Sequence, residues 1–349
     1  MSDKIKIGIT HGDINGIGYE IIIKSLIDNR LYESFIPIVY GSPKAAAYHR
    51  KALNIPNFSL NSINSADDAN PKRANIIDCC EENIRVELGK STKHGGSCAF
   101  NAIETAVKDL KEGKIDILVT CPINKHNIQS ESFNFPGHTE YLQEMLEGEE
   151  SLMLMVSDIL KVGVVTGHIP VSEVPSKITE EKILSKLRLL NQTLKKDFAI
   201  RKPKIAVLGL NPHAGDNGFI GKEEKNIIEP AIKKASDEGI IALGPYPADG
   251  LFGSSSLNKY DAILAMYHDQ GLTPFKALCF DTGVNFTAGL KAIRTSPAHG
   301  TAFEIAGQNI ASEESFRNAI YLALDVYRNR FSYNKLTKNP LKNFETDSE

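Results

Sequence analysis

Short apolar segments typical of β-strands alternate with longer amphipathic segments along most of the chain. The short segments are apolar almost throughout, which predicts strands covered on both faces, as in a mostly parallel sheet. Such strands in regular alternation with helices predict an α/β fold. The predicted strands are residues 5–10, 35–41, 114–120, 152–157, 161–167, 204–210 and 261–267.

Two of the longer segments carry a stripe of apolar residues at helical spacing. In residues 99–110 apolar side chains recur at i, i+3, i+4, i+7, i+8 and i+11, and residues 316–327 repeat this spacing. Such a stripe is typical of a helix that packs one face on a core. A chain of 349 residues usually forms about two domains or one large α/β unit. Residues 53–75, by contrast, are polar and irregular.

The composition argues against several classes of partner. The chain has 40 Lys and Arg against 43 Asp and Glu, a net charge of −3, and no block of like charges, so we expect no nucleic-acid partner. The five cysteines form no CxxC pair, which favours reduced thiols and a cytoplasmic location. No run approaches the ~18 apolar residues of a membrane helix, so we expect no membrane partner. A small molecule is the expected ligand.

Three histidines each follow a predicted strand: His168 ends KVGVVTGH, His213 ends KIAVLGLNPH, and His268 follows DAILAMY. In open α/β sheets, ligands bind beyond the carboxyl ends of the strands. A catalytic metal site commonly uses three protein ligands and keeps one position open, and neutral imidazole suits zinc and cobalt. We therefore interpret the three as candidate metal ligands, although each singly is also typical of a helix cap or a bond to a buried carbonyl. Asp249 is a carboxylate that can orient a ligand or accept a proton, or else cap a helix.

Two glycine-rich loops also follow strands. HGDINGIGYE (residues 11–20) contains neither GxGxxG nor GK[ST], so it is not a nucleotide fingerprint; an anion-binding or hinge turn remains an interpretation. NPHAGDNGFIGKEE (211–224) can approach a ligand closely, and we expect Glu223 and Glu224 in the first turn of the next helix. RTSPAHGTAFEIAG (294–307) precedes another predicted helix.

Lys276 and Arg294 are the candidate cations for an anionic substrate, because both are predicted in cleft loops beside glycines and hydroxyls. Ordinary surface charge is the alternative for both. In PGHTEYL (136–142), His138 and Thr139 are predicted at a turn before a helix. Thr139 as an N-cap is the alternative there.

Taken together, these blocks resemble a known family, the 4-hydroxythreonine-4-phosphate dehydrogenases of vitamin B6 synthesis. The resemblance runs from about Gly8 to Gly307. The last block also resembles the adenosine-binding loop of isopropylmalate and isocitrate dehydrogenases. One departure is in the first glycine loop, where the family commonly has GDPAGIGPE and this chain has Ile14, Asn15 and Tyr19 in place of Pro, Ala and Pro. The matching blocks are GDINGIGYE, PGHTEYL, GHIPVSEV, NPHAGDNGFIGKEE, GPYPADGLF, MYHDQGLTPFK and VNFTAGLKAIRTSPAHGTAFEIAG.

The resemblance implies a two-domain α/β/α fold of the isopropylmalate dehydrogenase type, with a mostly parallel sheet and no Rossmann domain. The expected domains are residues 1–128 with 310–349, and residues 129–309. It also implies a homodimer with a shared active site. The implied metal ligands are His168, His213 and His268, the last from the partner subunit. The implied substrate contacts are His138, Thr139, Lys276, Asn285 and Arg294, and the nucleotide is expected near His299, Gly300 and Thr301.

The implied chemistry is oxidation of a secondary alcohol by NAD or NADP with one divalent ion (Zn, Mg or Co), giving a β-keto acid that loses CO₂. The implied substrate is a small phosphorylated hydroxy acid: 4-phosphooxy-L-threonine, which yields 3-amino-2-oxopropyl phosphate for pyridoxal phosphate synthesis, or alternatively D-threonate or D-erythronate 4-phosphate. Asp249, His138 and Lys276 are the candidate proton acceptors. A metal-dependent hydrolase and a non-catalytic binding protein are alternatives of a different class.

Overall fold

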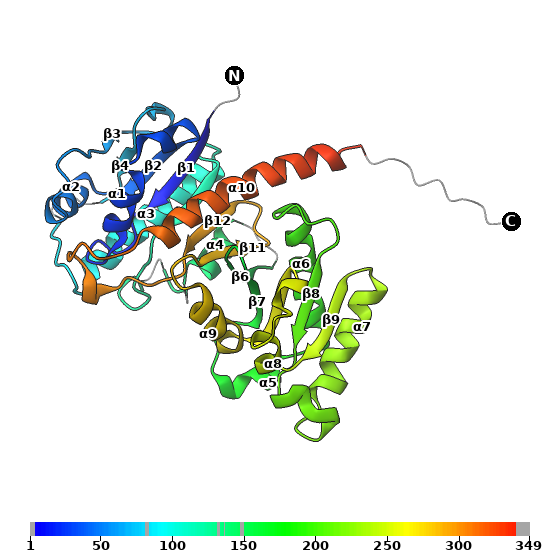
Figure 1. Ribbon diagram of the computed structural model, residues 1–349. Helices are drawn as coiled ribbons and strands as arrows, with labels where there is room; N and C mark the ends of the chain where they lie inside the picture. The colour runs from blue at the N-terminus through cyan, green and yellow to red at the C-terminus, as the bar shows by residue number, and fades with distance from the viewer. Residues whose placement is uncertain (1–3, 81–83, 131–132, 136, 147–149, 340–349) are drawn as a thin grey trace.

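The structure, a computed structural model, describes residues 4–80, 84–130, 133–135, 137–146 and 150–339. A single sheet of twelve strands runs through it, in the order β3-β4-β2-β1-β5-β12-β11-β6-β7-β10-β8-β9 (Figure 1). The strands are β1 (Ile5–Thr10), β2 (Phe35–Gly41), β3 (Asn61–Ile63), β4 (Asn75–Asp78), β5 (Ile117–Thr120), β6 (Leu152–Val156), β7 (Lys161–Thr166), β8 (Lys204–Leu208), β9 (Ile241–Tyr246), β10 (Ala262–Tyr267), β11 (Val284–Ala288) and β12 (Ile293–Pro297).

Both ends of the sheet are parallel, and the antiparallel pairs lie in the middle. There β11 runs antiparallel to β12 and to β6, and β6 runs antiparallel to β7. β12 is parallel to β5, so the sheet continues without interruption from the half around β1 to the half around β10. The mostly parallel α/β architecture predicted from the apolar segments is confirmed.

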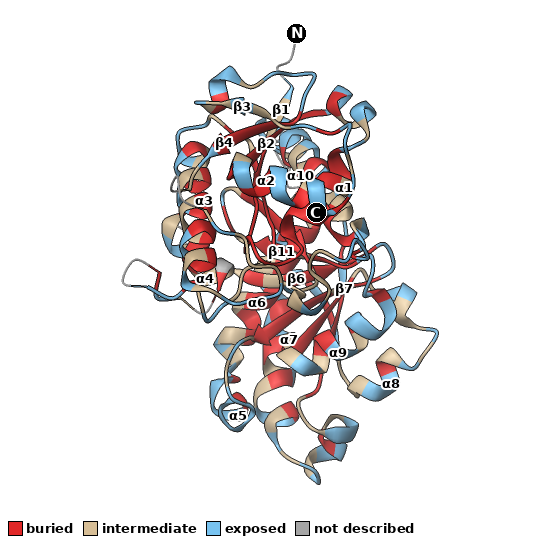
Figure 2. Cartoon of the chain, turned by 90° about the vertical axis from the view of Figure 1, so that its left-hand side faces the viewer, coloured by how far each residue is buried: buried red, intermediate tan, exposed pale blue. Residues whose placement is uncertain are grey.

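Helices cover both faces of the sheet, which explains why its strands are so uniformly apolar. On one face pack α1 (Gly18–Leu26), α2 (Pro43–Ala52), α6 (Glu180–Lys196), α7 (Glu229–Asp237) and α10 (Glu314–Thr337). On the other pack α3 (Lys93–Lys111), α4 (His138–Met145), α8 (Ala248–Phe252) and α9 (His268–Cys279); the short α5 (Val174–Lys177) follows β7. Figure 2 shows the buried sheet between helices with exposed outer faces.

The predicted strands and helices are present, and five further strands are added. β1 and β2 match their predicted bounds, and the two apolar stripes belong to α3 and α10. The strands that the pattern missed are β3, β4, β9, β11 and β12. β3 and part of β4 lie in residues 53–75, which we interpreted as irregular; β3 is three residues long and only partly buried. β9 is an edge strand with exposed residues. For these reasons neither β3 nor β9 shows a continuous apolar run.

The domain boundaries near residues 128 and 309 stay a prediction. The sheet continues from one expected domain into the other, where β5 pairs with β12. Within the described part of the chain, no helix combines the length and the apolar character needed to cross a bilayer. The antiparallel strands β11 and β12 carry two of the predicted site residues, Asn285 and Arg294.

Candidate active site

A cavity of about 250 Å³ lies where the two parallel halves of the sheet meet. Its walls come from the ends of β5, β7 and β10, from the strands β6, β11 and β12, and from α4 and α9. Residues as far apart in the chain as Cys121 and Gly300 are thereby brought together. The predicted site residues that line it are Thr139, His168, His268, Lys276, Asn285, Arg294, His299 and Gly300.

Arg294 forms the floor of this cavity. It lies within β12, not in a loop as expected, and is 2 % exposed, so the surface-charge alternative is wrong for this residue. Its Nε and Nη2 donate to Thr120 Oγ1 at 3.1 and 2.7 Å, and its Nη1 donates to Thr287 Oγ1 at 3.1 Å. Burial lowers the pKa of Arg294 to about 10, which leaves it charged at neutral pH. No described carboxylate forms an ion pair with it.

A buried charge without a counter-ion is costly unless something pairs with it. Lys276 and Lys125 also line the cavity, whereas Glu140 is the one carboxylate among the described lining residues. The cavity therefore has an excess of positive charge and suits an anionic ligand. Lys276 lies in α9, so it too is presented by a helix and not by a loop.

His168, just beyond β7, is held from both sides of its ring. Its Nδ1 lies 3.3 Å from Glu140 Oε1, and its Nε2 lies 3.4 Å from Lys125 Nζ. A carboxylate accepts and an ammonium donates, so this arrangement favours the neutral tautomer with the proton on Nδ1. Burial raises the pKa of Glu140, but the hydrogen bond from His168, a backbone hydrogen bond and the charges of His168 and Lys125 together outweigh burial, so the pKa of Glu140 is lowered. A carboxylate behind an imidazole is the usual way to orient a metal-binding histidine.

His268 is the first residue of α9, and its ring centroid lies 5.6 Å from that of His168. Its Nδ1 lies 2.7 Å from Asp269 Oδ1. Both imidazoles thus have a carboxylate at Nδ1. The Nε2 of His268 is left as an atom for a further ligand, whereas the Nε2 of His168 lies against Lys125 Nζ, which a ligand there has to displace. Two of the three predicted metal ligands are brought together within one chain.

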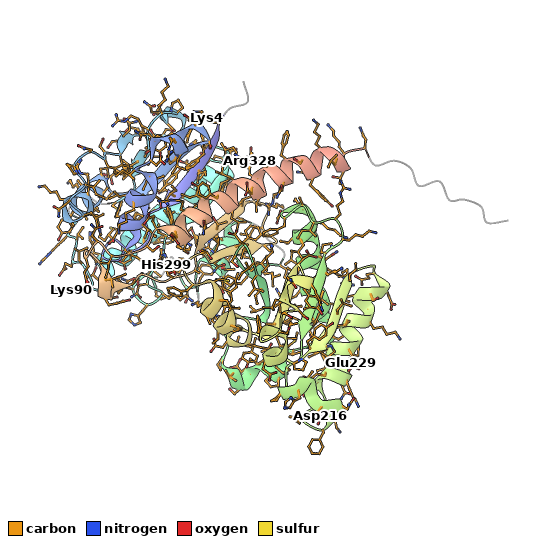
Figure 3. All side chains as sticks on the ribbon, viewed as in Figure 1. Lys4, Lys90, Asp216, Glu229, His299 and Arg328 are labelled. Atoms are coloured by element: carbon orange, nitrogen blue, oxygen red, sulfur yellow. The ribbon has the colours of Figure 1, made fainter. Side chains whose placement is uncertain are left out.

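His213, the third predicted ligand, is exposed and does not line the cavity. Its loop follows β8, which is the neighbour of β10. Among the described residues of this chain, no three His, Cys, Asp or Glu side chains are grouped closely enough to hold a metal ion. Asp216 of the same loop and His299 of the cavity wall are labelled in Figure 3 and lie well apart.

Asp249 is also exposed and outside the cavity lining. It lies inside α8, whose N-cap position is Pro247, so the N-cap alternative is wrong for Asp249. It is wrong for Thr139 as well, because the N-cap of α4 is Gly137. His138 begins α4, but its side chain lies outside the described residues.

Three buried polar atoms of the cavity wall have no hydrogen-bond partner in the described structure: Glu140 Oε2, Asn285 Oδ1 and His299 Nε2. Burial lowers the pKa of His299, which favours its neutral form. Unpaired buried polar atoms are costly, so such atoms mark positions for a ligand or water. Thr301 lies two residues after His299. Its carbonyl accepts from Ile17 N at 3.1 Å, so this segment packs on the first glycine loop.

Lys125 and Glu140 were missed by the sequence analysis. Like the three histidines, Lys125 follows a predicted strand, which is β5 in the structure. The same rule could therefore have identified it. Glu140 stands in the PGHTEYL block beside two predicted contacts. Their contacts with His168 span 43 and 28 residues and depend on tertiary structure.

Comparison with known proteins identifies relatives of this chain. A family model described as pyridoxal phosphate biosynthetic protein PdxA matches residues 33–323. A 4-hydroxythreonine-4-phosphate dehydrogenase of Bacteroides thetaiotaomicron is 53 % identical over 342 residues, 97 % of this chain and 93 % of that protein. A protein of Oceanobacillus iheyensis with the provisional name D-threonate 4-phosphate dehydrogenase is 41 % identical and covers 93 % of this chain and 99 % of its own.

Solved structures show the same fold. The crystal structure of 4-hydroxythreonine-4-phosphate dehydrogenase from Klebsiella pneumoniae superposes with a TM-score of 0.80 at 34 % identity, covering 93 % of this chain and 98 % of that one. Isocitrate dehydrogenase from Methylococcus capsulatus shares the fold alone, with a TM-score of 0.50 at 12 % identity over 96 % of this chain and 89 % of its own.

The fold and these matches define the class: the chain is an α/β dehydrogenase, an oxidoreductase that acts on an alcohol group. Within that class, the chain belongs to the family of the pyridoxal phosphate biosynthetic protein PdxA.

Proposed function

We propose that this chain oxidises 4-phosphooxy-L-threonine with NAD or NADP, to a β-keto acid that decarboxylates to 3-amino-2-oxopropyl phosphate in pyridoxal phosphate biosynthesis. The observation that carries this proposal is Arg294, a buried cation that lines the cavity and has no ion-pair partner among the described residues. Glu140 of the same cavity acts on it only from beyond ion-pair distance. A substrate with a phosphate and a carboxylate supplies the missing negative charge. The names of the relatives support this choice of substrate.

In this proposal the substrate's anionic groups bind Arg294 and Lys276, which lie in the same cavity wall. Thr139 and Asn285 add hydrogen bonds, and His138 stands beside Thr139 in the chain. The threonine hydroxyls on Arg294 fix the plane of its guanidinium, so it meets an anion without reorganising. Binding at two charged ends orients the secondary alcohol between them.

The metal ligands are proposed to be His168, His213 and His268. Imidazole donors fit a divalent ion such as Zn or Co, and they fit Mg less well because Mg prefers oxygen ligands. Two of the three donors, His168 and His268, adjoin within one chain. His213 does not line this cavity. In the proposed homodimer a second copy therefore contributes His213, and not His268 as the resemblance implied. When bound, such an ion lowers the pKa of a substrate hydroxyl and stabilises developing negative charge.

The nucleotide is proposed to lie along His299, Gly300 and Thr301. The unpartnered His299 Nε2 is a hydrogen-bonding atom available to it. NAD or NADP accepts the hydride from the alcohol carbon, while the hydroxyl proton goes to a base. Of the three candidate bases, Lys276 lines the cavity and Asp249 does not. The side chain of His138 lies outside the described residues. Loss of CO₂ then leaves an enolate carbon that takes up a proton.

The experiment is a nicotinamide absorbance assay on metal-loaded protein. 4-Phosphooxy-L-threonine and D-threonate 4-phosphate are offered side by side, because the relative from Oceanobacillus iheyensis makes the second the alternative substrate. We expect faster reduction with the first. Faster reduction with the second assigns the catabolic role, and turnover without coenzyme reduction assigns a hydrolase. No turnover of either substrate contradicts the proposal.

Arg294 provides the control for the binding mode. Replacing it by methionine should lower kcat/KM by about 10²- to 10³-fold, since losing one partner of a buried charge pair costs about 2–5 kcal/mol. Arg294→Lys keeps the charge but loses the planar fork held by Thr120 and Thr287, and should recover part of the loss. Equal kcat/KM in all three proteins contradicts an anion contact at this residue.

A further inference from the structure

The second glycine loop, residues 211–221, holds its backbone in an unusual conformation. Five consecutive residues have positive φ, four of them not glycine: His213 (54°), Ala214 (50°), Gly215 (79°), Asp216 (42°) and Asn217 (54°). L-residues avoid this left-handed region at a cost of about 1–2 kcal/mol each. A run of this kind persists when neighbouring groups hold it.

Glu224 is the group that holds it. This side chain is 2 % exposed and turns back from a single π-helical turn, η5 (Glu224–Ile228). Its Oε1 accepts from Leu210 N at 2.8 Å and from Asn211 N at 2.7 Å. Its Oε2 accepts from Asn211 Nδ2 at 3.0 Å. Three donors therefore fix both oxygens just before His213. Glu224 also occupies the first turn of the following helix, as predicted.

The glycines of the loop make room for this carboxylate. A Cβ on Gly215 would lie 2.5 Å from Glu224 Oε2, and a Cβ on Gly209 would lie 3.1 Å from Glu224 Oε1. Of the two glycines in NPHAGDNG, Gly215 is thus accounted for by the approach of Glu224, whereas Gly218 faces Lys225.

Gln270 ties the same loop to the helix that carries His268. Its Nε2 donates to Gly209 O at 2.6 Å, and its Oε1 accepts from Met266 N at 2.8 Å. The segment before His213 and the segment before His268 are therefore joined through one side chain. The position of His213 is set by two independent hydrogen-bonded braces.

We infer that Glu224 is a positioning residue for metal binding: it holds the left-handed turn that presents His213 to a divalent ion. This inference rests on the proposed function in taking His213 as a ligand. Glu224 does not itself contact the ion. Its effect passes through the conformation of residues 211–217, so it differs from a carboxylate that merely begins a helix.

The test measures Zn²⁺ binding to the metal-stripped full chain by calorimetry, with hydrogen exchange of residues 211–221 as the second readout. Glu224→Ala should weaken Zn²⁺ binding tenfold or more and speed exchange in the loop. Glu224→Gln keeps an oxygen for the two backbone amides and should fall between Glu224→Ala and the unmodified protein. Glu229→Gln, an exposed carboxylate at the start of α7, is the matched control and should change neither readout.

A double-mutant cycle separates positioning from a structural role. In a His213→Ala background, Glu224→Ala should cause no further loss of Zn²⁺ affinity, because both act through one ligand. Additive losses, unchanged affinity in Glu224→Ala, or absence of Zn²⁺ binding by the unmodified protein would overturn the inference. Thermal unfolding identifies a variant that does not fold, for which Glu224→Gln carries the test. Zn²⁺ binding without coenzyme reduction would sink the proposed function while leaving the role of Glu224 intact.

Discussion

The two glycine loops look alike in sequence, because each follows a strand and leads into a helix, but they are used in opposite ways. All residues of the first loop, 11–18, are buried. Its amides are satisfied internally: Asp13 N donates to Pro122 O at 3.0 Å and Ile17 N to Thr301 O at 3.1 Å. The second loop, 211–221, is largely exposed, with Phe219 at 87 %, and is held from beneath by Glu224.

Glycine content therefore does not identify a ligand-binding loop. The acceptors to which the backbone amides of the loop donate are the better guide. Most backbone amides of the first loop donate to other groups of the protein, which argues against the anion-binding interpretation of that turn. The structure also gives a reason for the departure from the family pattern in this loop. Asn15, which replaces alanine, hydrogen-bonds to residues 87–92 and so joins the loop to that segment. We expect the first loop to govern stability and the second to govern metal binding.

The largest effect on this comparison is expected from Asn15→Ala. Asn15 accepts from Glu87 N at 2.7 Å and donates to Lys90 O and Thr92 Oγ1 at 2.9 Å each. Losing three buried hydrogen bonds should lower the free energy of unfolding by about 3 kcal/mol. Urea unfolding measures this, and Asn226→Ala on η5, an exposed site, is the control. Zn²⁺ affinity of the folded variant should stay unchanged; a loss there would erase the contrast between the loops.

A second prediction concerns acid. Burial lowers the pKa of His11 to about 3, from an ordinary value of 6.5. As the pH falls below 6.5, the unfolded chain takes up a proton that the folded chain refuses, so stability that is complete above pH 6.5 is lost on acidification. Between pH 6.5 and 5 the loss should reach about 2 kcal/mol for this residue. Buried His49 acts in the same direction, and Asp13, whose pKa burial raises, acts in the opposite one.

Urea unfolding at the two pH values, in the unmodified protein and in His11→Asn, checks this. The variant should be less stable at neutral pH but should lose about 2 kcal/mol less on acidification. An identical pH dependence in both proteins would show that His11 is not responsible.

The smallest effect is expected from Gly215→Ala in the second loop. Gly215 has φ +79°, and an added Cβ would meet Glu224. We expect about tenfold weaker Zn²⁺ binding, equal to about 1.4 kcal/mol, with little change in the urea midpoint because an exposed loop can rearrange without opening the core. Gly113→Ala is the matched control, with φ +72° and nothing within 4 Å. A similar loss of Zn²⁺ affinity in both variants would show that backbone strain alone has this effect.

Much of the sheet could be predicted because parallel strands buried on both faces leave an unmistakable apolar run. β11 and β12 were missed because they alternate polar and apolar side chains or carry inward-facing groups such as Arg294. Placing histidines after strands correctly brought His168 and His268 together. The braces could not be predicted: Glu224 resembles any helix-starting carboxylate, and Lys125 meets His168 across 43 residues. Those contacts exist only once the chain has folded.

One consequence of the strand order concerns synthesis on the ribosome. β5 is completed at Thr120, yet its neighbour on one side, β12, begins at Ile293. Until that late strand emerges, β5 presents an open edge with unpaired amides and carbonyls, which favours aggregation. The cavity wall that carries Arg294 is therefore among the last parts to form. A nascent chain released early carries an adhesive edge at the place where the finished protein has this cavity.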